Sequence, residues 1–122
     1  MNHMKILVVD DDLILLESIG RGLRNRGYKV VETTSGAEAL RLIDLDNASD
    51  IKLVLADYIM PGMDGIGLLE KVREKYSSLP VIMMTAHWNK DVVIHAMRKR
   101  CNSFLEKPFT LDQLVHEIEA VI

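Results

Sequence analysis

The chain has 122 residues, of which 48% are hydrophobic and 27% charged, as expected of one globular domain with a substantial core. Its net charge of −3 argues against direct nucleic-acid contact, and a lone cysteine, Cys101, excludes an internal disulfide and a cysteine-based zinc site. No apolar run approaches the roughly 20 residues of a membrane span, and the start is too short and polar for a signal peptide, so we expect a cytoplasmic protein without membrane contact. We assign residues 1–4 to an N-terminal extension and 5–122 to a single domain.

Short apolar runs alternate with amphipathic segments along the whole chain. The apolar runs at 5–9, 53–57 and 81–85 lack polar alternation, as is typical of strands covered on both faces. In chain order the sequence predicts strand 5–9, helix 13–26, strand 29–33, helix 37–45, loop 46–51, strand 53–57, helix 65–76, strand 81–85, helix 90–100, strand 103–106 and a last helix after Thr110.

Turn and cap residues separate these elements. Gly27 stops the first helix, and the Pro61-Gly62 pair turns the chain after the third strand. Ser35 with Glu38 three residues later forms a plausible capping box, and Thr110 is a fair N-cap for the last helix. Strict alternation of strand and helix predicts right-handed crossovers and a parallel sheet with helices on both faces.

Polar residues stand where four of the predicted strands end. Asp10 and Asp11 follow the first strand, Asp57 ends the third, Thr85 ends the fourth, and Lys107 follows the fifth. Because the carboxyl ends of parallel strands share one edge of a sheet, these side chains can converge. Clustered carboxylates need a cation, and oxygen-only ligands select a hard ion such as Mg²⁺ over zinc. A lysine beside them would balance charge on Asp57 and on any anion attached to it.

Each of these residues also has a structural explanation when taken singly. Asp10 and Asp11 fit an acidic helix N-terminus, Asp57 a turn cap, Thr85 a strand end and Lys107 a solvated charge. Their joint occurrence at one sheet edge favours a functional site over coincidence.

With these motifs in view, the sequence closely resembles the receiver domains of two-component response regulators over essentially its whole length. The matching segments are Ile6-Leu7-Val8-Val9-Asp10-Asp11-Asp12, Asp57-Tyr58-Ile59-Met60-Pro61-Gly62-Met63-Asp64-Gly65, Thr85-Ala86 and Phe104-Leu105-Glu106-Lys107-Pro108-Phe109.

The resemblance implies a flavodoxin-like, doubly wound five-stranded α/β fold with strand order 2-1-3-4-5. It also implies a phosphoacceptor switch that takes a phosphoryl group from a histidine kinase or phosphotransfer protein onto Asp57. By it, Asp10, Asp11, Asp57 and the backbone carbonyl of Ile59 bind Mg²⁺, and Lys107 contacts the phosphoryl group.

Further roles follow from the same resemblance. Thr85 and Phe104 would form the switch pair, and the peptide before Pro108 would be cis. The surface that changes would comprise helix 90–100, strand 103–106 and the last helix, where phosphorylation-dependent homodimers of the family commonly form. The domain would be regulatory rather than an enzyme, apart from self-catalysed phosphotransfer and autodephosphorylation, and would control an output domain or effector protein.

The chain departs from the family's usual pattern at one place, and at two more places it has residues at positions that vary among family members. Receivers usually carry Gly-Ala where this chain has Arg100-Cys101, and arginine tolerates a left-handed helix end poorly, so the end of helix 90–100 is open. The resemblance places Ile59 and His87 at positions that vary in the family and that would flank the route of the water that hydrolyses the aspartyl phosphate. His87 fits an exposed loop residue better than a metal ligand.

Three other functions compete with this interpretation. An aspartyl-phosphate enzyme of the haloacid dehalogenase type would need a second aspartate where Ile59 stands. A flavin binder would need a phosphate loop after the first strand, where three acids repel phosphate. A degenerate receiver used only for docking would not retain Asp57, Thr85 and Lys107 together. The output stays open between a receiver that works alone and a fragment of a longer regulator.

Overall fold

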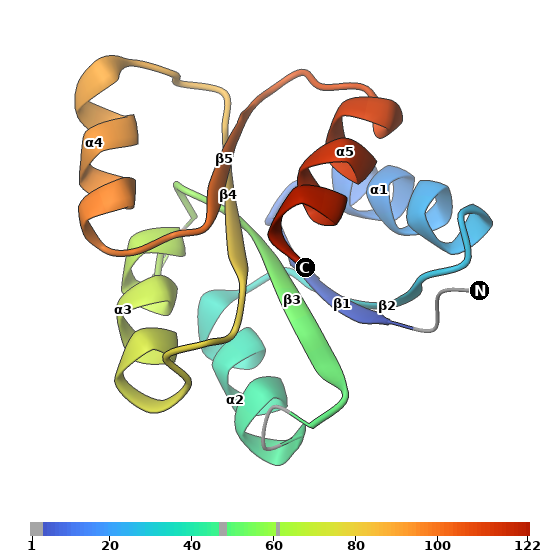
Figure 1. The fold of residues 1–122 in the computed structure, drawn as a ribbon, viewed down its shortest axis with the longest axis horizontal. Helices are drawn as coiled ribbons and strands as arrows, with labels where there is room; N and C mark the ends of the chain where they lie inside the picture. Colours follow the sequence, from blue (N-terminus) through green and yellow to red (C-terminus); the bar gives the residue numbers. More distant parts are fainter. Residues whose placement is uncertain (1–3, 47–48, 61) are drawn as a thin grey trace.

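The computed structural model describes residues 4–46, 49–60 and 62–122, and residues 1–3 of the predicted extension and Pro61 of the predicted turn lie outside them (Figure 1). The elements are β1 (Lys5–Val9), α1 (Leu13–Asn25), β2 (Lys29–Thr33), α2 (Gly36–Asp46), β3 (Ile51–Asp57), α3 (Gly65–Lys75), β4 (Val81–Thr85), α4 (Lys90–Arg98), β5 (Ser103–Glu106) and α5 (Leu111–Val121).

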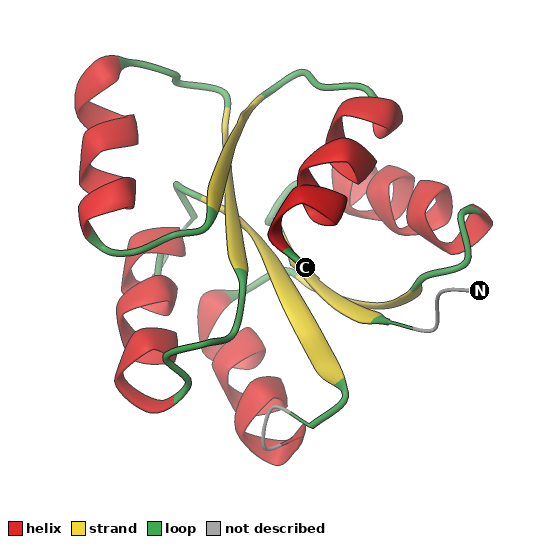
Figure 2. Ribbon diagram, viewed as in Figure 1, coloured by secondary structure: helices red, strands yellow, loops and turns green. Residues whose placement is uncertain are grey.

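The strands form one parallel sheet in the order β2-β1-β3-β4-β5. Helices α1 and α5 lie on one side of this sheet and α2, α3 and α4 on the other, as the red helices and yellow strands of Figure 2 show. The predicted flavodoxin-like α/β fold and its strand order are therefore confirmed.

The central strands are apolar throughout because each supplies two separate cores. In β1, Ile6 and Val8 pack with residues of α1 and α5, whereas Leu7 and Val9 pack with residues of α2 and α3. Successive side chains of a strand point to opposite faces, so a strand covered on both sides needs apolar residues at every position. This explains the missing alternation in the sequence.

The start of one strand, and the place of Met4 just before another, differ from the prediction. β3 begins at Ile51, so the predicted loop 46–51 ends too late. Ile51 is buried and pairs with Lys5, while the exposed Lys52 interrupts the apolar run and hides the strand start from the sequence pattern. Met4 also belongs to the fold, since its carbonyl accepts a hydrogen bond from Lys29 N and its side chain packs against the core shared by α1 and α5.

The N-termini of α2 and α5 differ in how many of their possible capping hydrogen bonds form. Ser35 Oγ accepts a hydrogen bond from Glu38 N, but the Glu38 carboxylate pairs with Arg41, so the structure shows the serine half of the predicted box. A complete capping box forms at α5, where Thr110 and Gln113 bond reciprocally.

The predicted helix 90–100 is too long, because α4 ends at Arg98 and Arg100 adopts a left-handed conformation with φ of 69°. Arg100 N donates to Met97 O and Cys101 N to Ala96 O, the pair of bonds that closes a helix in the Schellman motif. Gly27 makes the same turn at the end of α1 with φ of 94°. Arginine thus occupies a position that favours glycine.

Among the helices in residues 4–46, 49–60 and 62–122, none combines the length and apolar character needed to cross a membrane.

Candidate functional site

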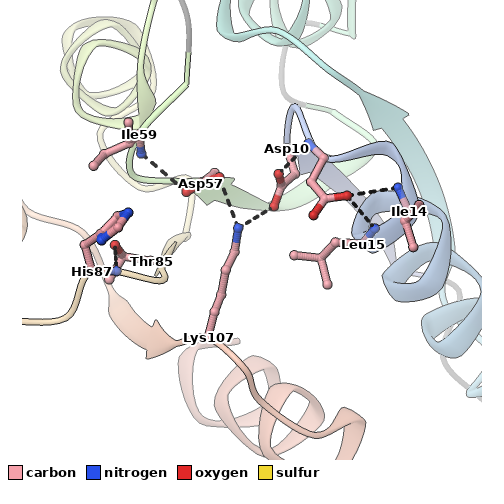
Figure 3. A network of polar contacts seen from close by, with 9 residues as sticks. Asp10, Ile14, Leu15, Asp57, Ile59, Thr85, His87 and Lys107 are labelled. Atoms are coloured by element: carbon pink, nitrogen blue, oxygen red, sulfur yellow. Dashed lines mark hydrogen bonds and ion pairs between the residues drawn. The ribbon is translucent and has the colours of Figure 1, made fainter.

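The site lies at the carboxyl ends of β1, β3 and β5, where one lysine joins two aspartates (Figure 3). Asp10 directly follows β1 and is fully buried, and Asp57 ends β3 with 8% of its surface exposed. Lys107, one residue beyond β5, places its Nζ atom 2.8 Å from Asp10 Oδ2 and 3.1 Å from Asp57 Oδ2. The sheet therefore brings together charges that lie far apart in the sequence.

The three consecutive aspartates after β1 have different roles. Asp12 is the N-cap of α1, and its carboxylate accepts hydrogen bonds from Ile14 N and Leu15 N. Asp10 turns inward, accepting from Asp12 N with one oxygen and from Lys107 with the other. Asp12 therefore serves as a helix cap, whereas Asp10 and the exposed Asp11 are candidates for the functional site.

Asp10, Asp11 and Asp57 form a group that fits a hard cation. Each offers a carboxylate oxygen, and these oxygens lie within 4.8 Å of one another. Lys107 supplies a single positive charge against three carboxylates, so an excess of negative charge remains. An all-oxygen donor set with this charge suits Mg²⁺ and disfavours softer metals.

Burial and neighbouring charges perturb both central groups. Burial raises the pKa of Asp57 above its usual range, Lys107 opposes this shift, and the Asp10 charge adds to it. Burial alone would lower the pKa of Lys107, but its hydrogen bonds to Asp10 and Asp57 outweigh that effect and raise the pKa. Lys107 is therefore held as a cation beside a carboxylate whose charge is costly to bury.

Thr85, Ile59 and His87 lie on the Asp57 side of these charges (Figure 3). Thr85 is buried, its Oγ1 accepts a hydrogen bond from His87 N at 3.0 Å, and its carbonyl accepts one from Lys107 N at 2.7 Å. Ile59 N donates to Asp57 Oδ1 at 3.3 Å, while the Ile59 side chain is 53% exposed. His87 is exposed in the loop after β4, as predicted.

A glycine permits α3 to begin against the end of β3. A Cβ atom at Gly65 would lie 2.1 Å from the Asp57 carbonyl oxygen and 2.6 Å from Met83 Cε, too close for any side chain. Gly65 N also donates to Tyr58 O. The backbone around Asp57 is therefore held between β4 and α3.

Phe104 belongs to a row of aromatic side chains. Its ring is 5.3 Å from the Trp88 ring and 6.2 Å from the Tyr58 ring, and Tyr58 continues the row to His95 of α4. The sequence pattern predicts no role for Tyr58, Trp88 or His95. The one sequence signal for Tyr58 is its position directly after Asp57, whereas His95 becomes its neighbour only in the folded chain.

The peptide bond between Lys107 and Pro108 is cis, in agreement with the expectation from the sequence.

A family model described as response regulator receiver domain matches residues 6–119. The chain is 36% identical over 122 residues to the chemotaxis protein CheY1 of Helicobacter pylori, a match that covers 98% of this chain and 97% of that protein. It is 35% identical over 117 residues to the DNA-binding transcriptional regulator NtrC of Escherichia coli, covering 96% of this chain but 24% of NtrC.

Solved structures of similar proteins share this fold. A response regulator receiver domain protein from Clostridium thermocellum superposes with a TM-score of 0.91 at 32% identity, covering 98% of this chain and 94% of that one. The family match extends over nearly all of β1 to α5, the part of the chain that builds the acidic site. The chain therefore belongs to the response regulator receiver domains, the regulatory domains of two-component signalling systems.

Proposed function

We propose that this receiver is a phosphoacceptor switch in which Asp57 takes a phosphoryl group from the phosphohistidine of a histidine kinase or phosphotransfer protein. The observation that carries this proposal is the Lys107 ammonium held between Asp10 and Asp57, with Asp11 beside them, at one edge of the sheet. A purely structural ion pair would not need a third carboxylate close by.

The chain's own residues support the transfer. A carboxylate oxygen of Asp57 attacks phosphorus, the phosphorus–nitrogen bond of the donor breaks, and its electron pair stays on the imidazole nitrogen, which then takes a proton. Lys107 offsets negative charge on the transferred phosphoryl oxygens, and Ile59 N–H orients the carboxylate through Asp57 Oδ1. The product is an aspartyl phosphate.

The acidic group would hold Mg²⁺ through the carboxylates of Asp10, Asp11 and Asp57 and the backbone carbonyl of Ile59. When bound, the ion would offset charge on the phosphoryl group and on the crowded carboxylates.

Thr85 and Phe104 would carry the change to the surface. New oxygens on Asp57 offer the Thr85 hydroxyl an acceptor, and its inward movement would leave space for the half-buried Phe104 ring. The face of α4, β5 and α5 would respond. It exposes 51% of Met97 and carries a groove of about 530 Å³ between β5 and α5.

We propose this face as the contact for an output domain or effector protein, or for a second phosphorylated copy of the chain. Its apolar residues suit such a contact. CheY1 is a chemotaxis protein and NtrC a DNA-binding transcriptional regulator, so relatives of this chain serve different outputs.

The test is phosphorylation by acetyl phosphate with Mg²⁺, followed by intact-protein mass spectrometry. Wild type should gain one phosphoryl group and Asp57→Asn none, because the amide is not a nucleophile for this reaction. Asp64→Asn is the matched control, since asparagine can replace Asp64 as the N-cap of α3. Equal labelling of Asp57→Asn and wild type would disprove the assignment.

A further inference from the structure

Helix α4 is weakly anchored by apolar packing. Of its nine residues only Ala96 is buried, while Ile94 is 37% and Met97 51% exposed. An element with few buried apolar contacts moves readily, so individual polar contacts have a large share in fixing its position.

One such contact joins α4 to the residue after Asp57. The Tyr58 hydroxyl lies 2.9 Å from His95 Nδ1, and the two rings meet edge to face at 6.3 Å with an interplanar angle of 78°. Tyr58 itself is held firmly, because its N–H donates to Met84 O at 2.7 Å and its carbonyl accepts from Gly65 N at 3.1 Å. The hydrogen bond therefore ties a movable helix to a fixed point at the end of β3.

The same tyrosine contacts the predicted switch residue. The rings of Tyr58 and Phe104 are 6.2 Å apart, and the Phe104 ring is 5.3 Å from Trp88. Trp88 directly precedes Asn89, the N-cap of α4. Rotation of Phe104 would consequently disturb packing on Tyr58 and at the start of α4 together.

We propose that the hydrogen bond between Tyr58 and His95 is a latch that holds α4 in its resting position and sets how readily the helix moves. Tyr58 and His95 are positioning residues in this proposal. The part that concerns the response to phosphorylation rests on the proposed function, whereas the restraint on the resting helix does not.

The restraint is tested by amide hydrogen exchange of α4 in the unphosphorylated protein. Tyr58→Phe and His95→Phe each remove one partner but keep an aromatic ring, and histidine and phenylalanine have similar helix propensity. Each variant should speed exchange of α4 amides about two- to tenfold, because loss of one neutral hydrogen bond raises the equilibrium constant for opening of the helix by about that factor. The double variant should match either single one, because all three lack the same bond.

Tyr76→Phe is the matched control. It removes a tyrosine hydroxyl that bonds Asp44 on α2, and it should leave α4 exchange unchanged. Wild-type exchange rates in Tyr58→Phe, or independent, multiplying effects in the double variant, would overturn the latch.

The response is tested with beryllofluoride and Mg²⁺, a mimic of the phosphoryl group, with fluorescence of Trp88, the chain's one tryptophan, as the signal. Loss of the latch favours the shifted helix, so the midpoint for beryllofluoride should fall by the same two- to tenfold as α4 exchange rises. Faster α4 exchange with an unchanged midpoint would overturn the coupling. If wild type gives no beryllofluoride response but Tyr58→Phe speeds α4 exchange, the proposed function fails and the latch stands.

Discussion

Lys107 is a partly buried cation whose side chain is 15% exposed and lies between two carboxylates. Replacing it with methionine keeps much of the side-chain volume but removes the charge that offsets the phosphoryl oxygens. We expect Lys107→Met to slow phosphorylation of Asp57 by acetyl phosphate by roughly 100-fold, the usual loss for one electrostatic contact at a reacting group. The rate is measured by quenched mass spectrometry.

The same variant should remain folded by circular dichroism and should show a smaller change in Trp88 fluorescence on adding beryllofluoride. Lys75→Met is the control, because Lys75 pairs with Asp44 on the exposed surface and away from the site. A full response in Lys107→Met would identify Lys107 as a structural charge without a role in switching.

Ile59 is predicted to govern how long the phosphoryl group persists. Its exposed apolar side chain cannot hydrogen-bond a water that attacks the aspartyl phosphate. Ile59→Asn adds a donor and an acceptor there, and should speed loss of phosphate roughly tenfold, as about 1.4 kcal/mol from one hydrogen bond would do.

The decay is followed after removal of the phosphodonor. Ile14→Asn replaces an even more exposed isoleucine on α1, 83% exposed, and should decay as wild type does. His87→Ala should also alter the rate. Coincident decays for wild type and Ile59→Asn would move control of the lifetime to another residue.

At the level of elements, the connection from α4 to β5 contains the strained, left-handed Arg100 and is held by several hydrogen bonds from Arg73. Arg73 of α3 donates to the Arg100 carbonyl at 2.9 Å, to Leu79 O at 2.6 Å and to Asn102 Oδ1 at 2.7 Å. These bonds hold the left-handed Arg100 in place. The Arg100 charge also helps to lower the pKa of Arg73, after the larger effect of burial, so the two guanidinium groups repel each other.

Arg100→Gly should therefore stabilise the protein by about 1 kcal/mol, since glycine adopts positive φ without steric cost and removes the repulsion. Urea unfolding measures the change. Arg98→Gly, two residues earlier within α4, should have the opposite sign and cost about 1 kcal/mol, because helical φ brings glycine no advantage. Destabilisation by Arg100→Gly would mean that the arginine side chain makes up for its backbone strain.

For the whole molecule, Mg²⁺ binding and folding should be linked, because the carboxylates of the site meet only in the folded sheet. At a Mg²⁺ concentration about 100-fold above its Kd, the free energy of unfolding should rise by about 2.7 kcal/mol. Urea unfolding in MgCl₂ is compared with unfolding in NaCl of equal ionic strength.

Asp11→Asn should lose most of this stabilisation, since one anionic ligand is removed. Asp12→Asn should keep it, because Asp12 caps α1 and asparagine caps a helix equally well. Equal Mg²⁺ stabilisation of wild type and Asp11→Asn would exclude Asp11 from the metal site.

Most strands and helices of this molecule, and the edge of the sheet that carries the site, could be predicted from the sequence, because the sequence patterns that specify them are local. Apolar runs such as 5–9 and 81–85 specify buried strands, and a polar residue after each run marks its carboxyl end. Strand–helix alternation then requires a parallel sheet, which places Asp10, Asp57 and Lys107 at one edge. The order of the strands came from the family resemblance, not from the pattern itself.

The tertiary structure decided what depends on partners distant in the chain. Ile51 joins the sheet because it pairs with Lys5, and Met4 is held just before β1 by a hydrogen bond from Lys29 N, although polar neighbours obscure both residues in the sequence. The bond between Tyr58 and His95 forms only because α4 packs near the loop that follows β3, and the spacing of the two residues along the chain does not predict it. Hydrophobic periodicity records which face of an element is buried, but the partner of an individual polar group is set only when the elements pack together.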